Sequence, residues 1–175
     1  QEKADVSLVD SLIAKGALLK DSNMPIGNVI SRSIKKGNSK VIASLIKNGA
    51  SVRDLESEYS NGIIEGFNAE DQDIIKLMID SGADVKKLDD SGFSPIALAA
   101  KSGMPEVFEM LVKKGADVNQ TSKNSSAIPL DIVIEKQNSE ILKIMYDNGL
   151  KTDPNSLLVR VVGDGKFKVL PVLLA

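Results

Sequence analysis

Two pairs of residues have the spacing of a nucleophile and the base that activates it. They are Ser33 with Lys36 and Ser44 with Lys47. Ser-x-x-Lys is the spacing of penicillin-binding proteins and serine β-lactamases, in which the serine attacks an acyl group. The motif is short, the companion motifs of those enzymes are absent, and both copies fall in segments with a helical pattern. We therefore predict that the protein is not an enzyme, and keep a Ser–Lys or carboxylate site as an alternative.

Two other stretches contain parts of ligand-binding loops. Residues 89–92 (DDSG) bring two carboxylates together but lack the alternating ligands and distal glutamate of a calcium loop, so we interpret them as a turn. Residues 163–166 (GDGK) lack the full glycine spacing of a phosphate loop and are expected to end a helix. Asn119 and Asn124 begin glycosylation sequons, which matter only in a eukaryotic secreted protein. The sequence predicts no metal and no cofactor.

The composition narrows the chemistry further. The chain has no cysteine and no histidine, so thiol nucleophiles, disulfides and the commonest metal ligand and general base are all excluded. Lys and Arg number 22 against 24 Asp and Glu, and this balance gives no reason to expect nucleic-acid binding. No apolar run reaches the roughly 18–20 residues that span a bilayer, so we expect no membrane insertion.

The chain begins with Gln1 and shows no signal peptide, so we expect an N-terminus that is processed or cut. Zero cysteine fits export slightly better than retention. The expected location is therefore exported and periplasmic, with the cytoplasm as the alternative.

A short sequence motif, in which apolar residues are followed by a glycine, recurs along the chain. Its glycines stand at 16, 49, 82, 115 and 149, which is a repeat period of 33, 33, 33 and 34 residues. Four apolar residues precede each glycine with spacing i, i+1, i+4, i+5, which places them on one helical face. The five quartets are Leu8, Val9, Leu12, Ile13; Val41, Ile42, Leu45, Ile46; Ile74, Ile75, Met78, Ile79; Val107, Phe108, Leu111, Val112; and Ile141, Leu142, Met145, Tyr146.

Each quartet predicts a helix that ends at its glycine, because glycine adopts the left-handed conformation that closes a helix. A second, shorter helix precedes it and is clearest at residues 94–103. There the Ser94 hydroxyl is placed to cap the first turn, Pro95 suits the first helical position and Gly103 ends the helix. Such a helix pair buries its apolar stripe only by stacking on its neighbours.

Residues 89–119 (DDSGFSPIALAAKSGMPEVFEMLVKKGADVN) resemble an ankyrin repeat almost position for position. The family pattern D-x-x-G-x-T-P-L-H-x-A-A, a glycine, an apolar helix and G-A-D-V-N is kept, with Ser94 for threonine and Ala97 for histidine. The other copies are more degenerate. Gly62 stands where the proline belongs, and Glu70 stands where the mid-loop glycine belongs.

The predicted fold is therefore all-α: a single ankyrin-repeat domain over 1–175, with five to six helix-turn-helix units and short extended connectors. The units are expected at about 1–20, 21–53, 54–86, 87–119, 120–153 and 154–175. The first shows only its second helix, entered near Asp5. The last repeats the quartet at Val169, Leu170, Leu173 and Leu174, and Pro171 should restrict the start of its helix.

The resemblance implies binding of another protein on a concave groove and on the connector tips, called fingers, at 22–26, 55–60, 88–93 and 121–126. Phe93 is the favoured hot spot, because binding energy concentrates in a few anchors that are often aromatic. The alternative is that finger side chains fold back between adjacent fingers. The predicted partner-binding residues are Met24, Ile26, Lys35, Lys36, Glu56, Glu58, Tyr59, Asp90, Phe93, Lys101, Lys114, Lys123 and Lys136.

The expected function is non-catalytic protein binding by a monomer. A narrower hypothesis is that the protein occludes a partner enzyme, in the manner of exported bacterial ankyrin proteins that act as inhibitors or self-protection factors. The alternative is an ankyrin segment of a larger secreted effector or scaffold.

Overall fold

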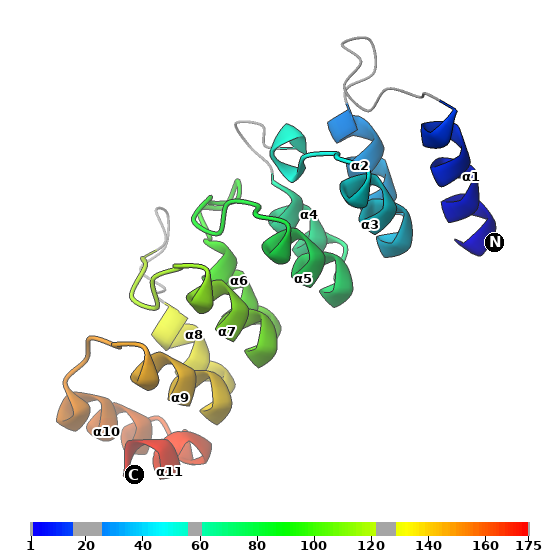
Figure 1. Ribbon diagram of the computed structural model, residues 1–175. Coiled ribbons are helices and arrows are strands. Elements are labelled where there is room, and N and C mark those ends of the chain that lie inside the picture. Colours follow the sequence, from blue (N-terminus) through cyan, green and yellow to red (C-terminus); the bar gives the residue numbers. More distant parts are fainter. Residues whose placement is uncertain (1, 16–25, 56–60, 122–128, 175) are drawn as a thin grey trace. The chain divides into compact units, whose positions relative to one another are not determined.

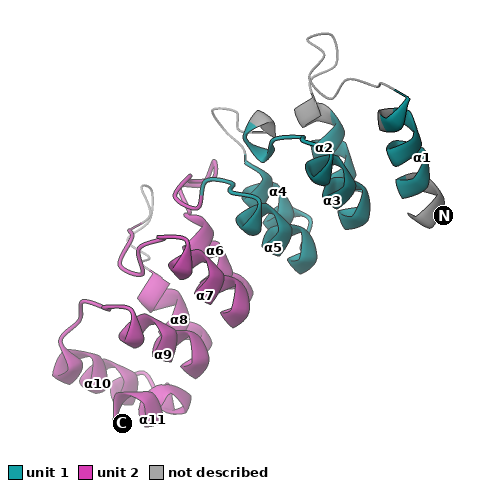
Figure 2. Cartoon of the chain, in the orientation of Figure 1, with its two compact units in different colours: residues 1–84 teal, residues 85–175 magenta. Residues whose placement is uncertain are grey.

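The computed structural model describes residues 2–15, 26–55, 61–121 and 129–174, and these residues form helices and connectors with no strand (Figure 1). They divide into two compact units, residues 1–84 and 85–175 (Figure 2). The first contains α1 (Glu2–Ala14), α2 (Ile26–Lys35), α3 (Ser39–Lys47), the 3-10 turn η1 (Val52–Leu55), α4 (Gly62–Asn68) and α5 (Gln72–Asp80). The second contains α6 (Pro95–Ser102), α7 (Pro105–Lys113), α8 (Pro129–Lys136), α9 (Ser139–Asp147), α10 (Pro154–Gly163), η2 (Phe167–Val169) and α11 (Leu170–Leu173).

The helices pair and stack as the repeat predicts. Within the first compact unit α2 packs on α3 and α4 on α5, and the pairs join through α2 with α4 and α3 with α5. Within the second, α6 pairs with α7 and α8 with α9, while α6 stacks on α8 and α7 on α9. The division falls after Asp84, in a connector, so each compact unit holds three of the predicted repeats. The all-helical repeat fold is confirmed, whereas the single domain over 1–175 stays a prediction.

The quartets supply the cores. Ile74, Ile75, Met78 and Ile79 are each 0% exposed, since α5 has α4 beneath it and α3 beside it. The first three members of the quartets on α3, α7 and α9 are also buried, and the fourth is half-buried. Burial of side chains of this size contributes about 1.5–3 kcal/mol each.

The end helices differ from this expectation. Leu8 is 60% exposed, Leu12 51% and Leu174 72%, so the prediction that these quartet positions are buried is wrong. The reason is that α1 packs mainly against α3, and α11 against α9 and α10, so none of the described helices covers part of each stripe. The first helix also begins at Glu2 rather than near Asp5.

Five corresponding positions between the two helices of a pair adopt a left-handed backbone. Three carry glycine: Gly37 at φ 63°, Gly103 at φ 67° and Gly165 at φ 67°. The other two carry Glu70 at φ 54° and Gln137 at φ 52°. The degenerate repeats therefore keep the turn geometry of the family without its glycine, at a steric cost that the packed helices offset.

Polar side chains begin most helices. Ser94 accepts a hydrogen bond from Ala97 N, as predicted, and Pro95 occupies the first turn of α6. Asn38, Asp71 and Asn138 cap α3, α5 and α9 in the same way, but Met104, at the corresponding position before α7, offers no side-chain acceptor. At the last pair, Gly163 ends α10 and Pro171 lies in the first turn of α11, both as expected.

Candidate protein-binding surface

The finger at residues 88–93 is a turn organised by one carboxylate. Asp89 Oδ1 accepts hydrogen bonds from Ser91 N at 2.9 Å and Phe93 N at 2.8 Å, while Asp89 N donates to Phe93 O at 2.9 Å. Gly92 N donates to Asp89 O, and Gly92 has a φ of 83°. The predicted turn is confirmed, and it leaves the neighbouring Asp90 exposed.

Phe93 is half-buried and lies against its own repeat. The Lys101 ammonium stands 5.1 Å from the centre of the Phe93 ring, within the range of a cation–π contact. Lys101 belongs to the last turn of α6 and is exposed. The ring therefore folds toward the end of its own first helix and remains partly open to solvent.

The other predicted residues lie at the ends of helices. Lys36 follows α2, Lys114 follows α7, and Lys35 and Lys136 are the last residues of α2 and α8; all four are exposed. Asp90, Phe93 and Lys101 come from one repeat, so the second compact unit brings them together. Ile26 begins α2. Met24, Glu56, Glu58, Tyr59 and Lys123 lie outside the described residues.

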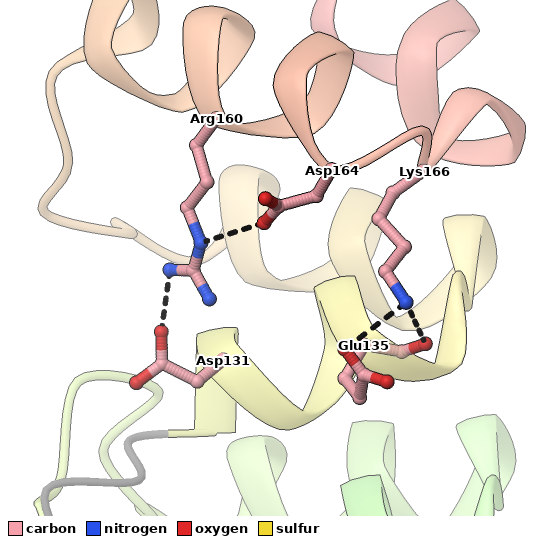
Figure 3. A network of polar contacts seen from close by, with 5 residues as sticks. All are labelled: Asp131, Glu135, Arg160, Asp164 and Lys166. Atoms are coloured by element: carbon pink, nitrogen blue, oxygen red, sulfur yellow. Dashed lines mark hydrogen bonds and ion pairs between the residues drawn. The ribbon is translucent and has the colours of Figure 1, made fainter.

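The structure also shows an ionic cluster that the sequence analysis missed, formed by Asp131, Glu135, Arg160, Asp164 and Lys166 (Figure 3). Arg160 donates to Asp131 at 2.6 Å and lies 3.8 Å from Asp164. Lys166 Nζ is 3.0 Å from the Glu135 carboxylate and 3.5 Å from the Glu135 carbonyl oxygen. The cluster joins α10 and the turn after it to α8. The i, i+4 spacing of Arg160 and Asp164 is its only trace in the sequence.

Asn119 bridges two repeats. Its side-chain amide donates to Gly149 O at 3.0 Å, and its side-chain oxygen accepts from Lys151 N at 2.8 Å. A glycan on that amide nitrogen would disrupt this bridge. We therefore interpret Asn119 as a structural asparagine and not as a glycosylation site. Asn124, which begins the second, lies outside the described residues.

The residues that suggested catalysis have structural roles here. Ser33 Oγ donates to Val29 O at 2.8 Å, and Ser44 Oγ donates to the carboxylate of Asp10 on α1. Burial raises the pKa of the Tyr146 phenol, the opposite of what a tyrosine acting as a base near neutral pH requires. Within the described ranges, no group of three acidic side chains is placed to hold a metal ion.

Stacked helix pairs with left-handed turns at fixed intervals define a helical-repeat protein. A family model described as ankyrin repeats, in three copies, matches residues 63–157, more than half of the chain, and the protein belongs to the ankyrin-repeat family. No curated protein matches the chain significantly. Ankyrin repeats are protein-interaction modules that are generally non-catalytic. Among the described residues, no helix is long and apolar enough to cross a membrane.

Proposed function

We propose that this protein acts without catalysis, by binding another protein on its fingers and on the exposed ends of its first helices. The observation that carries the proposal is the finger at 88–93. Its backbone is held by Asp89, and it presents the partly open ring of Phe93 beside the exposed side chains of Asp90 and Lys101. A preorganised aromatic anchor beside charged groups is the usual composition of a binding hot spot.

The mode of action that we propose is occlusion by a monomer, in which the repeat surface covers a partner enzyme and inhibits it. Binding alone accomplishes this, because a rigid surface that covers an active site needs no chemistry of its own. The absence of cysteine fits an exported, periplasmic location, which we propose with the cytoplasm as alternative.

Capture of partners from source-cell extracts tests the proposal, with the original chain compared with Phe93→Ala and Phe167→Ala. Phe167 is the matched control, since it is a 58% exposed phenylalanine of the same compact unit, away from the finger. Circular dichroism and melting curves must agree among the three proteins. We expect to capture a partner whose affinity for Phe93→Ala is at least about tenfold lower than its affinity for the original chain. Its affinity for Phe167→Ala should be unchanged.

A partner retained equally by all three proteins would place the binding surface elsewhere, and an extract that yields no partner would contradict the proposed function. The activity of the captured protein, measured with and without the chain, then tests occlusion. Unchanged activity would rule out inhibition and leave binding intact.

A further inference from the structure

The ends of the first helices in the second compact unit carry positive charge that the described structure does not neutralise. Lys101, in the last turn of α6, contacts the ring of Phe93. Lys136, the last residue of α8, is exposed. Within the residues that the structure describes, neither ammonium meets a carboxylate, although the chain has two more acidic than basic residues.

The acidic residues on these two helices are not available to balance the lysines. The acidic residues of α8 are Asp131 and Glu135, and both belong to the ionic cluster. Asp131 is paired with Arg160, and Glu135 is paired with Lys166 (Figure 3). Helix α6 contains no acidic residue. On the second helix α7 the arrangement differs, since Lys113 is paired with Glu109 at 2.8 Å. Among the described residues, the lysine charge at the ends of α6 and α8 therefore has no carboxylate partner.

The contact between Lys101 and Phe93 prepares the site for an anion. A ring attracts the ammonium without cancelling its charge and restricts the long side chain, so less conformational entropy is lost when a carboxylate binds. The favourable interaction of a lysine with a helix C-terminus accounts for the placement of Lys101 and Lys136. It does not account for the lack of carboxylate partners on both helices.

We propose that the surface formed by Phe93, Lys101 and Lys136 binds an acidic segment of the partner protein. An apolar side chain of that segment contacts the Phe93 ring, and carboxylates of the same segment reach the two lysines. This inference rests on the proposed function and specifies the chemistry of the partner. Because α6 and α8 pack on each other, one extended segment reaches both helix ends.

Fluorescence anisotropy with labelled peptides tests the inference. The probe is a short peptide of glutamates around one central leucine, and its control replaces every glutamate by glutamine. Lys101→Gln with Lys136→Gln is the test variant. The matched control is Lys113→Gln with Lys143→Gln, which removes the same charge from exposed positions on α7 and α9 of the same two repeats.

We expect salt-sensitive binding of the glutamate peptide to the original chain and to the control variant, and affinity lower by about fivefold to tenfold in the test variant. The glutamine peptide should not bind. Equal binding by both variants, or no binding of the glutamate peptide to the original chain, would overturn the inference. An oligonucleotide bound more tightly than the peptide through the same lysines would also overturn it, by pointing to a nucleic-acid ligand.

The two proposals fail separately. A partner captured from extracts whose binding is unaffected by the substitutions at Lys101 and Lys136 preserves the proposed function and overturns this inference. A glutamate peptide that binds through these lysines, with no partner in any extract, supports the inference and contradicts the proposed function.

Discussion

Glu70 and Gln137 adopt the same left-handed backbone, at φ 54° and 52°, in the turns where other repeats have Gly37, Gly103 and Gly165. Both residues carry a steric penalty that glycine avoids, and both lie between helices whose packing holds the turn in place. The family geometry in these repeats is thus imposed by the helices that flank the turn.

Replacing Glu70 by glycine should stabilise the protein by about 1 kcal/mol, because the left-handed conformation costs a residue with a Cβ about that much. Urea denaturation followed by circular dichroism measures the change. Glu140→Gly, in the first turn of α9, is the control and should destabilise by a similar amount. A lower urea midpoint for Glu70→Gly would show that the glutamate side chain contributes more than the strain costs.

Gln137→Gly should raise the free energy of unfolding by less than Glu70→Gly does. The reason is that Gln137 Oε1 also accepts a hydrogen bond from Lys168 N at 3.3 Å, which the glycine variant loses.

Gly66 of α4 should not tolerate alanine, although alanine is the better helix former. A Cβ built there would lie 2.8 Å from Ile75 Cγ1 and 3.3 Å from Ile75 N, so α4 and α5 would have to separate. We expect Gly66→Ala to destabilise the protein by about 1–3 kcal/mol, measured by thermal and urea unfolding. Gly163→Ala is the matched control, because no atom lies within 4 Å of its Cβ position. Equal effects at the two glycines would mean that close packing at Gly66 is not what excludes alanine.

The helix α7 lacks the side-chain cap that α3, α5 and α9 have. Met104→Asn should supply an acceptor for the first turn and raise stability by about 0.5–1 kcal/mol, reduced by whatever the half-buried methionine contributes through packing. Asn138→Ala, which removes the corresponding cap of α9, should cost about 1 kcal/mol. Thermal melting of Met104→Asn and Asn138→Ala tests both expectations. A destabilised Met104→Asn would indicate that the methionine is retained for its packing.

Arg160→Ala should loosen the last helix pair with little effect on the rest. Arg160 and Asp131 have side chains 43% and 33% exposed, so the pair is worth no more than about 1 kcal/mol and salt weakens it. Hydrogen exchange at low salt should speed up over residues 154–174, while α6 and α7 stay protected. Lys113→Ala, which breaks an exposed pair within α7, should leave exchange at 154–174 unchanged. Uniform acceleration along the chain would contradict a local role for the ionic cluster.

Most of the fold could be predicted from the sequence, because its signals are local. The period of the closing glycines, the apolar quartets and the Ser94-Pro95 start each depend on residues within a turn or two of one another. These features determined the helix pairs, the all-α repeat class and the position of the finger at 88–93.

Only the tertiary structure decided which side chains from different helices meet. Arg160 of α10 pairs with Asp131 of α8, and no local pattern in the sequence predicts that contact. The Phe93 ring meets Lys101, which lies in the last turn of α6. Leu8, Leu12 and Leu174 are exposed because the neighbouring described helices leave part of their stripe uncovered. Repetition in the sequence determines the helices and their buried faces, whereas the surface that a partner meets depends on contacts between residues far apart in the chain.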